Sequence, residues 1–261
     1  LEIRIGFEQN GKRTHQAISI TMRTPGEDAE LAAGFLFTEG IITSPEQIKQ
    51  IRHCGLKIGA GKGTLDRVNS LNSNTIRVDL ADGTTIDLKK LDRHFYTTSS
   101  CGVCGKSSIE ALHSGAQKIA DPGYPRVDAA FINRLPTSLR EAQSNFEKTG
   151  GLHASGLFNA DGTLDLIRED VGRHNALDKV LGRKFLDGEI PLSDKVLLVS
   201  GRTSFELVQK ALMAGIPILA AVGAPSSLAV ELAREFGMTL IGFVRDDRFN
   251  IYSEHQRVNT Y

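Results

Sequence analysis

The sequence predicts an α/β protein with an N-terminal α+β domain followed by a three-layer α/β/α domain. The 261 residues, 40% of them hydrophobic, are enough to bury a large core. After residue 194, continuous apolar strands alternate with amphipathic helices, which predicts a partly parallel sheet with both faces covered. The stretch 120–126 has two Pro and one Gly and predicts a boundary between domains at 1–120 and 121–261.

Local patterns predict the elements of the first domain. Pro25 and Gly26 open a helix because the apolar residues after Asp28 recur at helical spacing, and Ser44 to Gln47 reads as a capping box. In order, we predict a strand at 15–24, a helix opening at 25–28, a capped helix start at 44–47, and a hairpin of 75–80 with 84–88 around the turn 81–83.

The second domain has a different rhythm, in which strands and helices alternate. Thr203 and Glu206 form a capping box at the start of one of its helices. In order, we predict a helix at 132–146, strands at 152–158 and 163–168, a helix at 173–181, a strand at 195–199, a helix at 204–214, a strand at 217–222, a helix at 226–236 and a strand at 239–244.

Composition limits the classes of function. The formal net charge is zero, so the chain as a whole is not a basic nucleic-acid binder. No apolar run approaches the ~18 residues of a membrane span. Three cysteines are too few for a disulfide scaffold of this size. We therefore expect a protein of the reducing cytoplasm without nucleic-acid or membrane partners.

The segment Cys101-Gly102-Val103-Cys104-Gly105 carries the best candidate nucleophile. It holds two of the three cysteines, and the residues after Lys106 read as the start of a helix. A helix N-terminus and a neighbouring Lys both favour the thiolate form of a cysteine. Such a thiolate can attack sulfur, bind a soft metal or cycle to a disulfide.

Zinc binding is the main alternative for Cys101 and Cys104. A closed zinc site needs about four N or S ligands, and the remaining cysteine, Cys54, has no CxxC partner. Cys54 reads as a small buried hydrophobe. The sequence therefore favours sulfur chemistry over a structural metal, with Cys104 a weaker candidate than Cys101.

Several basic residues fall at predicted strand-to-helix turns. Arg173, His174 and Asp178 follow Gly172, and Arg202 occupies the equivalent turn further along the chain. Ligands of open α/β sheets gather outside the carboxyl ends of the strands, where helix N-termini attract phosphate. The alternative is that His174 and Asp178 form an ordinary i,i+4 surface pair and that Arg202 is a solvated helix cap. Together with two arginines at 245 and 248, the pattern favours a pocket for an anionic ligand.

Five long motifs occur together and in order. They are 22–28 (MRTPGED) leading to 39–41, 100–105 (SCGVCG), 149–154 (TGGLHA), 169–179 (EDVGRHNALDK) and 200–206 (SGRTSFE) leading to 209–211. This set resembles the formate dehydrogenase accessory sulfurtransferase family, the FdhD-type proteins. The resemblance spans nearly the whole chain, and the combination is specific although no single motif is.

The resemblance implies a sulfur carrier with sulfurtransferase activity. Such proteins accept persulfide sulfur from a cysteine desulfurase and pass it to the bis-molybdopterin guanine dinucleotide form of the molybdenum cofactor, before this cofactor enters formate dehydrogenase. Cys101 would carry the persulfide. Cys104 is the second catalytic candidate, with three alternative roles: to relay sulfur, to resolve the persulfide or to shape the loop. The resemblance also implies a homodimer and a cytidine-deaminase-like fold for the second domain. No resident metal is implied.

The family's cofactor-binding segment corresponds to residues near the end of the chain, and GDP or GMP would mimic its ligand. The segment and the two residues that we group with it are Phe243, Val244, Arg245, Asp246, Asp247 and Arg248, with Arg202 and His174. Two of these residues, Asp246 and Asp247, are acidic, whereas some relatives have a Pro-Gly turn at this place.

Deaminase activity is excluded. The zinc deaminases need a His-x-Glu pattern, whereas His153 is followed by Ala154-Ser155.

Two rival functions remain open. In the first, the protein is a non-catalytic chaperone that binds the guanylated cofactor, and the CxxC segment only docks a partner. In the second, it is a zinc-stabilised binding module, which would lose its fold on chelation.

Overall fold

The computed structural model describes residues 1–9, 11–54, 74–84, 86, 116, 118–143 and 146–260. The strands are β1 (Glu2–Gln9), β2 (Lys12–Ile20), β3 (Ile48–His53), β4 (Thr75–Leu80), β5 (Val127–Asp128), β6 (His153–Asn159), β7 (Leu164–Asp170), β8 (Lys195–Val199), β9 (Ile218–Ala221), β10 (Thr239–Gly242), β11 (Asn250–Ser253) and β12 (Val258–Asn259). The helices are α1 (Asp28–Thr38), α4 (Ala129–Ala142), α5 (Phe146–Thr149), α6 (Arg173–Leu186), α7 (Phe205–Met213) and α8 (Ser227–Phe236), with 3-10 turns at Pro45–Gln47 and His255–Arg257.

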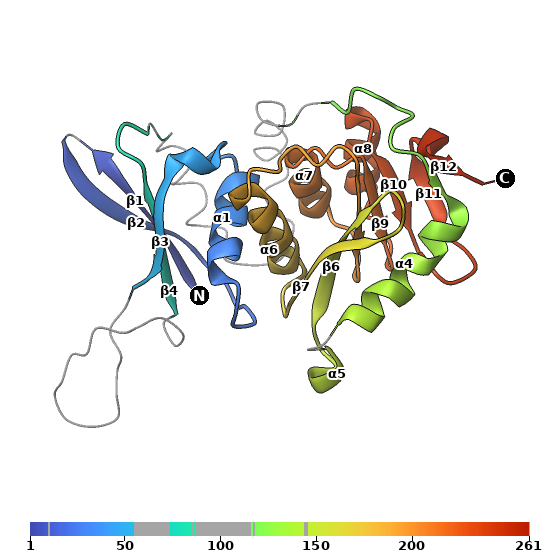
Figure 1. The fold of residues 1–261 in the computed structure, drawn as a ribbon, viewed down its shortest axis with the longest axis horizontal. Coiled ribbons are helices and arrows are strands. Elements are labelled where there is room, and N and C mark those ends of the chain that lie inside the picture. Colours follow the sequence, from blue (N-terminus) through green and yellow to red (C-terminus); the bar gives the residue numbers. More distant parts are fainter. Residues whose placement is uncertain are drawn as a thin grey trace.

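Two main sheets stand on either side of a helical layer (Figure 1). The smaller one has the order β2-β1-β4-β3, and its buried side chains include Ile3, Ile5 and Val78. β4 pairs with β1 on one edge and with β3 on the other. The predicted pairing of 75–80 with 84–88 is therefore wrong, because β4 has no free edge; Thr85, Asp87 and Leu88 themselves lie outside the described residues.

The larger sheet has the order β11-β10-β9-β8-β6-β7. β8, β9 and β10 are parallel, while β6 and β7 form an antiparallel hairpin joined to β8 through β6. The partly parallel sheet that the sequence predicts is confirmed. As a result, the ends of β7, β8, β9 and β10 and the start of β6 meet at one edge, which we call the carboxyl edge.

Helices cover both faces of this larger sheet, as the continuous apolar strands predict. Leu197 and Leu219 point to the face under α6, α7 and α8, where they join one buried cluster. Their neighbours Leu198 and Ala220 point to the opposite face and pack with Phe131 and other residues of α4. The mixed α/β class and its three layers are thus present in the structure.

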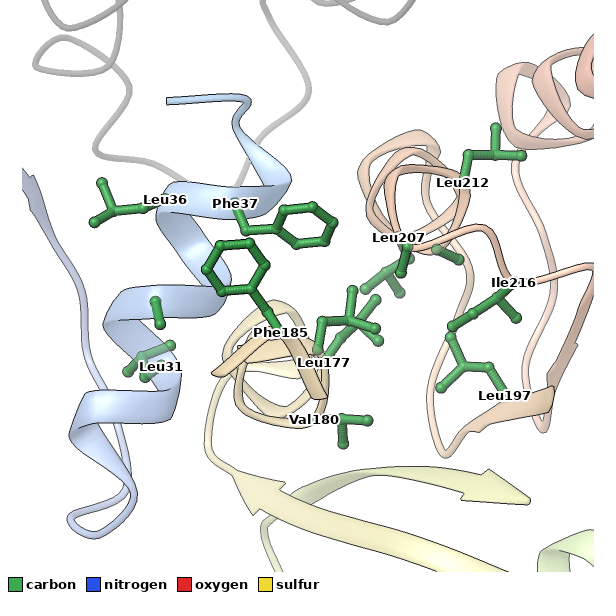
Figure 2. Close-up of a cluster of buried hydrophobic side chains, with 14 of the residues drawn as sticks. Leu31, Leu36, Phe37, Leu177, Val180, Phe185, Leu197, Leu207, Leu212 and Ile216 are labelled. Atoms are coloured by element: carbon green, nitrogen blue, oxygen red, sulfur yellow. The ribbon is translucent and has the colours of Figure 1, made fainter. Parts of the chain in front are cut away.

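A single hydrophobic cluster joins the smaller sheet to the larger one. Figure 2 shows Phe37 of α1 beside Phe185 of α6, and their rings stack with centroids 4.8 Å apart. Leu177 on the same helix continues the cluster toward α7. The core therefore crosses the predicted boundary between 1–120 and 121–261, and that division stays a prediction.

The helices α1 and α6 touch through glycine. A Cβ added to Gly34 would lie 1.9 Å from the carbonyl oxygen of Asp178, and one added to Gly182 would lie 1.9 Å from that of Glu30. Neither position accepts a side chain unless the helices separate. The two glycines therefore set the distance between α1 and α6.

At two predicted helix starts the structure differs from the prediction. The N-cap of α7 is Ser204, not Thr203. The hydroxyl of Thr203 is buried and has no hydrogen-bond partner in the described part of the chain. The capping box at 203–206 is therefore wrong. At 44–47 the side-chain oxygen of Gln47 does accept the Ser44 N–H at 3.1 Å, but β3 begins at Ile48 and limits the helix to one 3-10 turn.

We expect Gly34→Ala to destabilise the protein by about 3 kcal/mol, because the added methyl overpacks the contact between the helices. Helix propensity alone would make the alanine variant more stable by about 1 kcal/mol. A loss of stability therefore shows that the contact between the helices is tight. Urea unfolding followed by circular dichroism measures it. Gly123→Ala is the control, since a Cβ there meets nothing closer than 3.5 Å. Equal stabilities of the two variants would show that the helices are free to separate.

Candidate functional site

The two cysteines of the CxxC segment, Cys101 and Cys104, lie outside the described residues, as does Lys106. Cys54 directly follows β3 and is only partly buried, so it is less enclosed than the sequence suggests. Burial raises the pKa of its thiol, which lowers the thiolate fraction. Cys54 is therefore poorly suited to act as a nucleophile. In the described ranges, no group of three or more His, Cys, Asp or Glu side chains is arranged to hold a metal.

The predicted basic residues gather at the carboxyl edge of the larger sheet. Arg202 follows β8, while Arg245 and Arg248 follow β10. Arg173 and His174 begin α6, directly after the end of β7. The antiparallel hairpin brings the end of β7 to this edge, and the parallel order of β8, β9 and β10 brings the others. The fold thus places side chains from distant parts of the sequence along one edge.

A buried ion pair fixes the loop before α1 to the start of α6. Lys179 Nζ lies 3.0 Å from the carboxylate of Asp170, and neither side chain is exposed. The same carboxylate accepts the N–H of Thr24 at 3.0 Å, and Lys179 donates to the Thr24 carbonyl at 3.0 Å. Two of the five motifs, 22–28 and 169–179, are therefore joined by partly buried hydrogen bonds around a fully buried ion pair.

Asp178 does not form the i,i+4 surface pair with His174 that the sequence allows. It is buried, and its two carboxylate oxygens lie 2.9 and 3.0 Å from Nζ of Lys210. The hydroxyl of Thr38 accepts from Lys210 at 2.8 Å and donates to Asp178 at 3.0 Å. Although burial opposes the charge, the carboxylates of Asp178 and Glu39 raise the pKa of Lys210. Asp178 therefore binds α1, α6 and α7 together and does not face a ligand.

His174 is a neutral side chain at this edge. Its Nε2 lies 3.2 Å from the hydroxyl of Ser204, the N-cap of α7. Burial, together with the positive charges of Lys210 and Arg173, lowers the pKa of His174 to about 4. At neutral pH it can hydrogen-bond a ligand but adds no positive charge to the anion site that the sequence predicts.

His153 and Arg173 lie next to each other beside Gly201. A Cβ on Gly201 would be 3.3 Å from Nδ1 of His153 and 3.8 Å from Cδ of Arg173. Burial, and then the charge of Arg173, lowers the pKa of His153. Nε of Arg173 is buried and has no hydrogen-bond partner in the described part of the chain. The sequence analysis named Arg173 as part of an anionic pocket but left His153 out of the site, although the motif 149–154 contains it.

The segment after β10 forms a hollow of about 280 Å³. Phe243, Arg245 and Arg248 line it, and all three are exposed. Val244 instead points into the core and is completely buried, while its N–H donates to Ala221 at 3.0 Å. Its side chain therefore anchors the segment and is not available to a ligand, which corrects the set of side chains expected to contact the cofactor.

The acidic pair in this segment faces solvent and α4. One carboxylate oxygen of Asp246 accepts the hydroxyl of Thr137 at 3.2 Å, and Asp247 is exposed. Arg245 donates to the carbonyl of Val222 at 3.0 Å. Arg202 is exposed on the neighbouring turn and lines neither the hollow nor the cleft described next.

A larger cleft of about 650 Å³ adjoins the hollow on the side of α4. Thr137 and Val222, which contact the segment 243–248, are also part of its wall. The rest of the wall comes from the end of α4, from Gln143 and Phe146, from the motif 149–154 and from Ser200. The sequence analysis missed the wall residues that come from α4, because α4 contains no recognisable motif.

The fold and this edge define the class of protein as a mixed α/β protein with a basic, hollowed carboxyl edge. The family model described as "FdhD/NarQ family" matches residues 2–259. The chain is 52% identical over 260 residues to the sulfur carrier protein FdhD of Mycolicibacterium paratuberculosis, covering 99% of this chain and 89% of that protein. The FdhD proteins of Streptomyces coelicolor and Saccharolobus solfataricus are 51% and 40% identical, and the matches cover 99% of this chain and 86% and 88% of theirs.

The chain therefore belongs to the FdhD/NarQ family. A crystal structure from Desulfotalea psychrophila, described as a formate dehydrogenase accessory protein, superposes with a TM-score of 0.65 at 25% identity and covers 99% of both chains. The resemblance drawn from the five motifs is confirmed. Within the described residues, no helix is long and apolar enough to cross a membrane.

We expect His174 to make stability depend on acid pH. The unfolded chain takes up a proton near the ordinary pKa of 6.5, whereas folded His174 takes it up only near 4. The titration of His174 therefore leaves the free energy of unfolding unchanged above about pH 6.5. As the pH falls from there toward 4, the unfolded chain gains the proton first and the free energy of unfolding decreases. Between these limits the wild type should lose up to about 3 kcal/mol more than His174→Gln, measured by urea unfolding. His15→Gln, which alters an exposed side chain, should behave like the wild type. Parallel pH profiles for wild type and His174→Gln would contradict the assignment.

Proposed function

We propose that this protein is a sulfur carrier in the maturation of formate dehydrogenase. Relatives that are 52% and 51% identical over almost the entire chain are named sulfur carrier protein FdhD. The Desulfotalea psychrophila structure is described as a formate dehydrogenase accessory protein. These names, together with the CxxC motif at 101–104, carry the proposal.

The chemistry that we propose begins with the Cys101 thiolate. It attacks the outer sulfur of a persulfide on a cysteine desulfurase, so that a new S–S bond forms on Cys101 and the desulfurase leaves as a thiolate. The proton stays on the transferred sulfur. A low thiol pKa increases the thiolate fraction and also makes Cys101 a good leaving group when the sulfur departs. Cys104 is proposed to assist one of these two steps.

The acceptor is proposed to be the molybdenum of bis-molybdopterin guanine dinucleotide, bound by its nucleotide arms at the carboxyl edge. The hollow beside Phe243, Arg245 and Arg248 supports this location, because an aromatic ring and two arginines suit a base and phosphates. Arg202 adds positive charge on a neighbouring turn, and His174 offers a neutral hydrogen-bonding group. Asp246 and Asp247 bring negative charge, which restricts where phosphate lies.

The second domain is proposed to be cytidine-deaminase-like, and the protein to work as a homodimer in the cytoplasm. The three layers around a mixed sheet support the fold, while the His153-Ala154-Ser155 sequence lacks the glutamate of deaminase chemistry. The wider partners are the desulfurase that donates sulfur and the formate dehydrogenase that accepts the mature cofactor.

Treatment of the protein with a cysteine desulfurase and cysteine should add one sulfur atom to Cys101. Mass spectrometry of the peptide before and after a reductant measures this addition and its removal. Cys101→Ala should abolish the addition and formate dehydrogenase maturation in cells. Cys54→Ala is the matched control and should retain both. An unmodified Cys101 in a protein that still binds the cofactor would support the non-catalytic chaperone instead.

We expect GMP binding at the Arg248 hollow to weaken by about 1.5–3 kcal/mol in Arg248→Ala, the usual size of a hydrogen bond to a charged group. Added salt should weaken wild-type binding as well, because arginine–phosphate contacts are screened. Isothermal titration calorimetry measures both effects. Arg183→Ala, which changes a half-exposed arginine near the other end of α6, is the control. Unchanged affinity in Arg248→Ala would place the nucleotide site elsewhere.

A further inference from the structure

The cleft between α4 and the start of β6 is not part of the segment 243–248 that the proposed function uses. Its volume of about 650 Å³ lies in the range of small-molecule sites, about 300–1,000 Å³. Its wall combines residues of the motif 149–154 with Arg140 and Phe146. The cleft therefore has both the size and the mixed polar and aromatic character of a ligand site.

Gly151 leaves part of this wall open. A Cβ added there would meet only the carbonyl oxygen of Thr149, at 3.9 Å, and the backbone at Gly151 is not left-handed. The N–H of Gly151 has no hydrogen-bond partner among the residues that the structure describes. In the described chain, neither packing nor backbone conformation requires glycine at position 151. Close approach of a ligand to the backbone is a further reason for glycine, and it is the one that the open wall leaves.

His153 supplies a second donor in the same wall. Its ring makes no hydrogen bond within the described ranges, and it lines the cleft. Arg173 lies beside it with Nε buried and unpartnered there. A neutral imidazole, a free backbone N–H and a neighbouring guanidinium form a set of donors that suits an anionic group such as phosphate.

Another part of the wall suits a flat group. The guanidinium carbon of Arg140 lies 3.8 Å from the centre of the Phe146 ring, and both residues line the cleft. Arginine planes and aromatic rings are the surfaces on which nucleobases stack. Glu141, which follows Arg140 in the chain, also lines the cleft and repels phosphate, so we assign the anionic group to Gly151 and His153.

We propose that this cleft is a second nucleotide site, which binds the phosphate of a nucleoside monophosphate at Gly151 and His153 and its base against Arg140 and Phe146. It adjoins the Arg248 hollow, since Val222 lines the cleft and its carbonyl accepts from Arg245. The inference goes beyond the proposed function and does not depend on persulfide chemistry at Cys101.

Calorimetry with GMP tests the site in the full chain carrying Arg248→Ala, which weakens the neighbouring hollow. Binding should remain in this background and should weaken at least tenfold when Gly151→Val fills the wall. Gly123→Val is the matched control, because a Cβ at Gly123 also meets only ordinary contacts. Absence of GMP binding in the Arg248→Ala protein, or binding unchanged by Gly151→Val, would overturn the proposal. Neither result changes the test of the proposed function, which compares GMP binding by the wild type with GMP binding by Arg248→Ala.

Two further variants assign the two ends of the ligand in the same background. His153→Gln should weaken binding of inorganic phosphate and of GMP by similar factors. Arg140→Met should weaken GMP binding about tenfold and leave the affinity for inorganic phosphate unchanged. Circular dichroism confirms that each variant is folded. Phosphate affinity that is insensitive to His153→Gln would show that the anion does not bind at this end of the cleft.

Discussion

The contact between α1 and α6 is the constraint on which the rest of the structure depends. Gly34 and Gly182 let the two helices meet backbone to backbone, so that one hydrophobic core extends from the smaller sheet to the larger one. Breaking a buried ion pair by removing one partner costs about 3–5 kcal/mol. The pairs Asp170–Lys179 and Asp178–Lys210 therefore hold α6 firmly against the loop before α1 and against α7.

This constraint explains why charged motif residues have different roles. Asp170, Lys179, Asp178 and Lys210 are buried and satisfy one another, which fixes the position of the start of α6. Arg173 occupies that start and retains an unpartnered Nε in the described part of the chain. Three of these buried residues, Asp170, Asp178 and Lys179, thus belong to the same motif as Arg173 and lie within a few positions of it.

The carboxyl edge combines positive charge with neutral imidazole. Arg248 lies in the exposed hollow, whereas His153 lies in the larger cleft, and burial lowers the pKa of His153. A neutral imidazole accepts or donates one hydrogen bond without adding to the charge of the site. The anion binding proposed at this edge therefore takes its positive charge from arginine, while neutral imidazole and backbone N–H groups supply only hydrogen bonds.

The sequence by itself determined the family and most elements of the larger sheet, because the five motifs are contiguous and hydrophobic period is a local property. It placed β8 at Lys195–Val199 correctly, and it identified Arg245 and Arg248 near the hollow. Only the tertiary structure decided what depends on partners distant in the chain. Pairing on both edges of β4 excluded the local hairpin, and burial against Lys210 removed Asp178 from the site. A side chain's role depends on its neighbours in space, which no local pattern specifies.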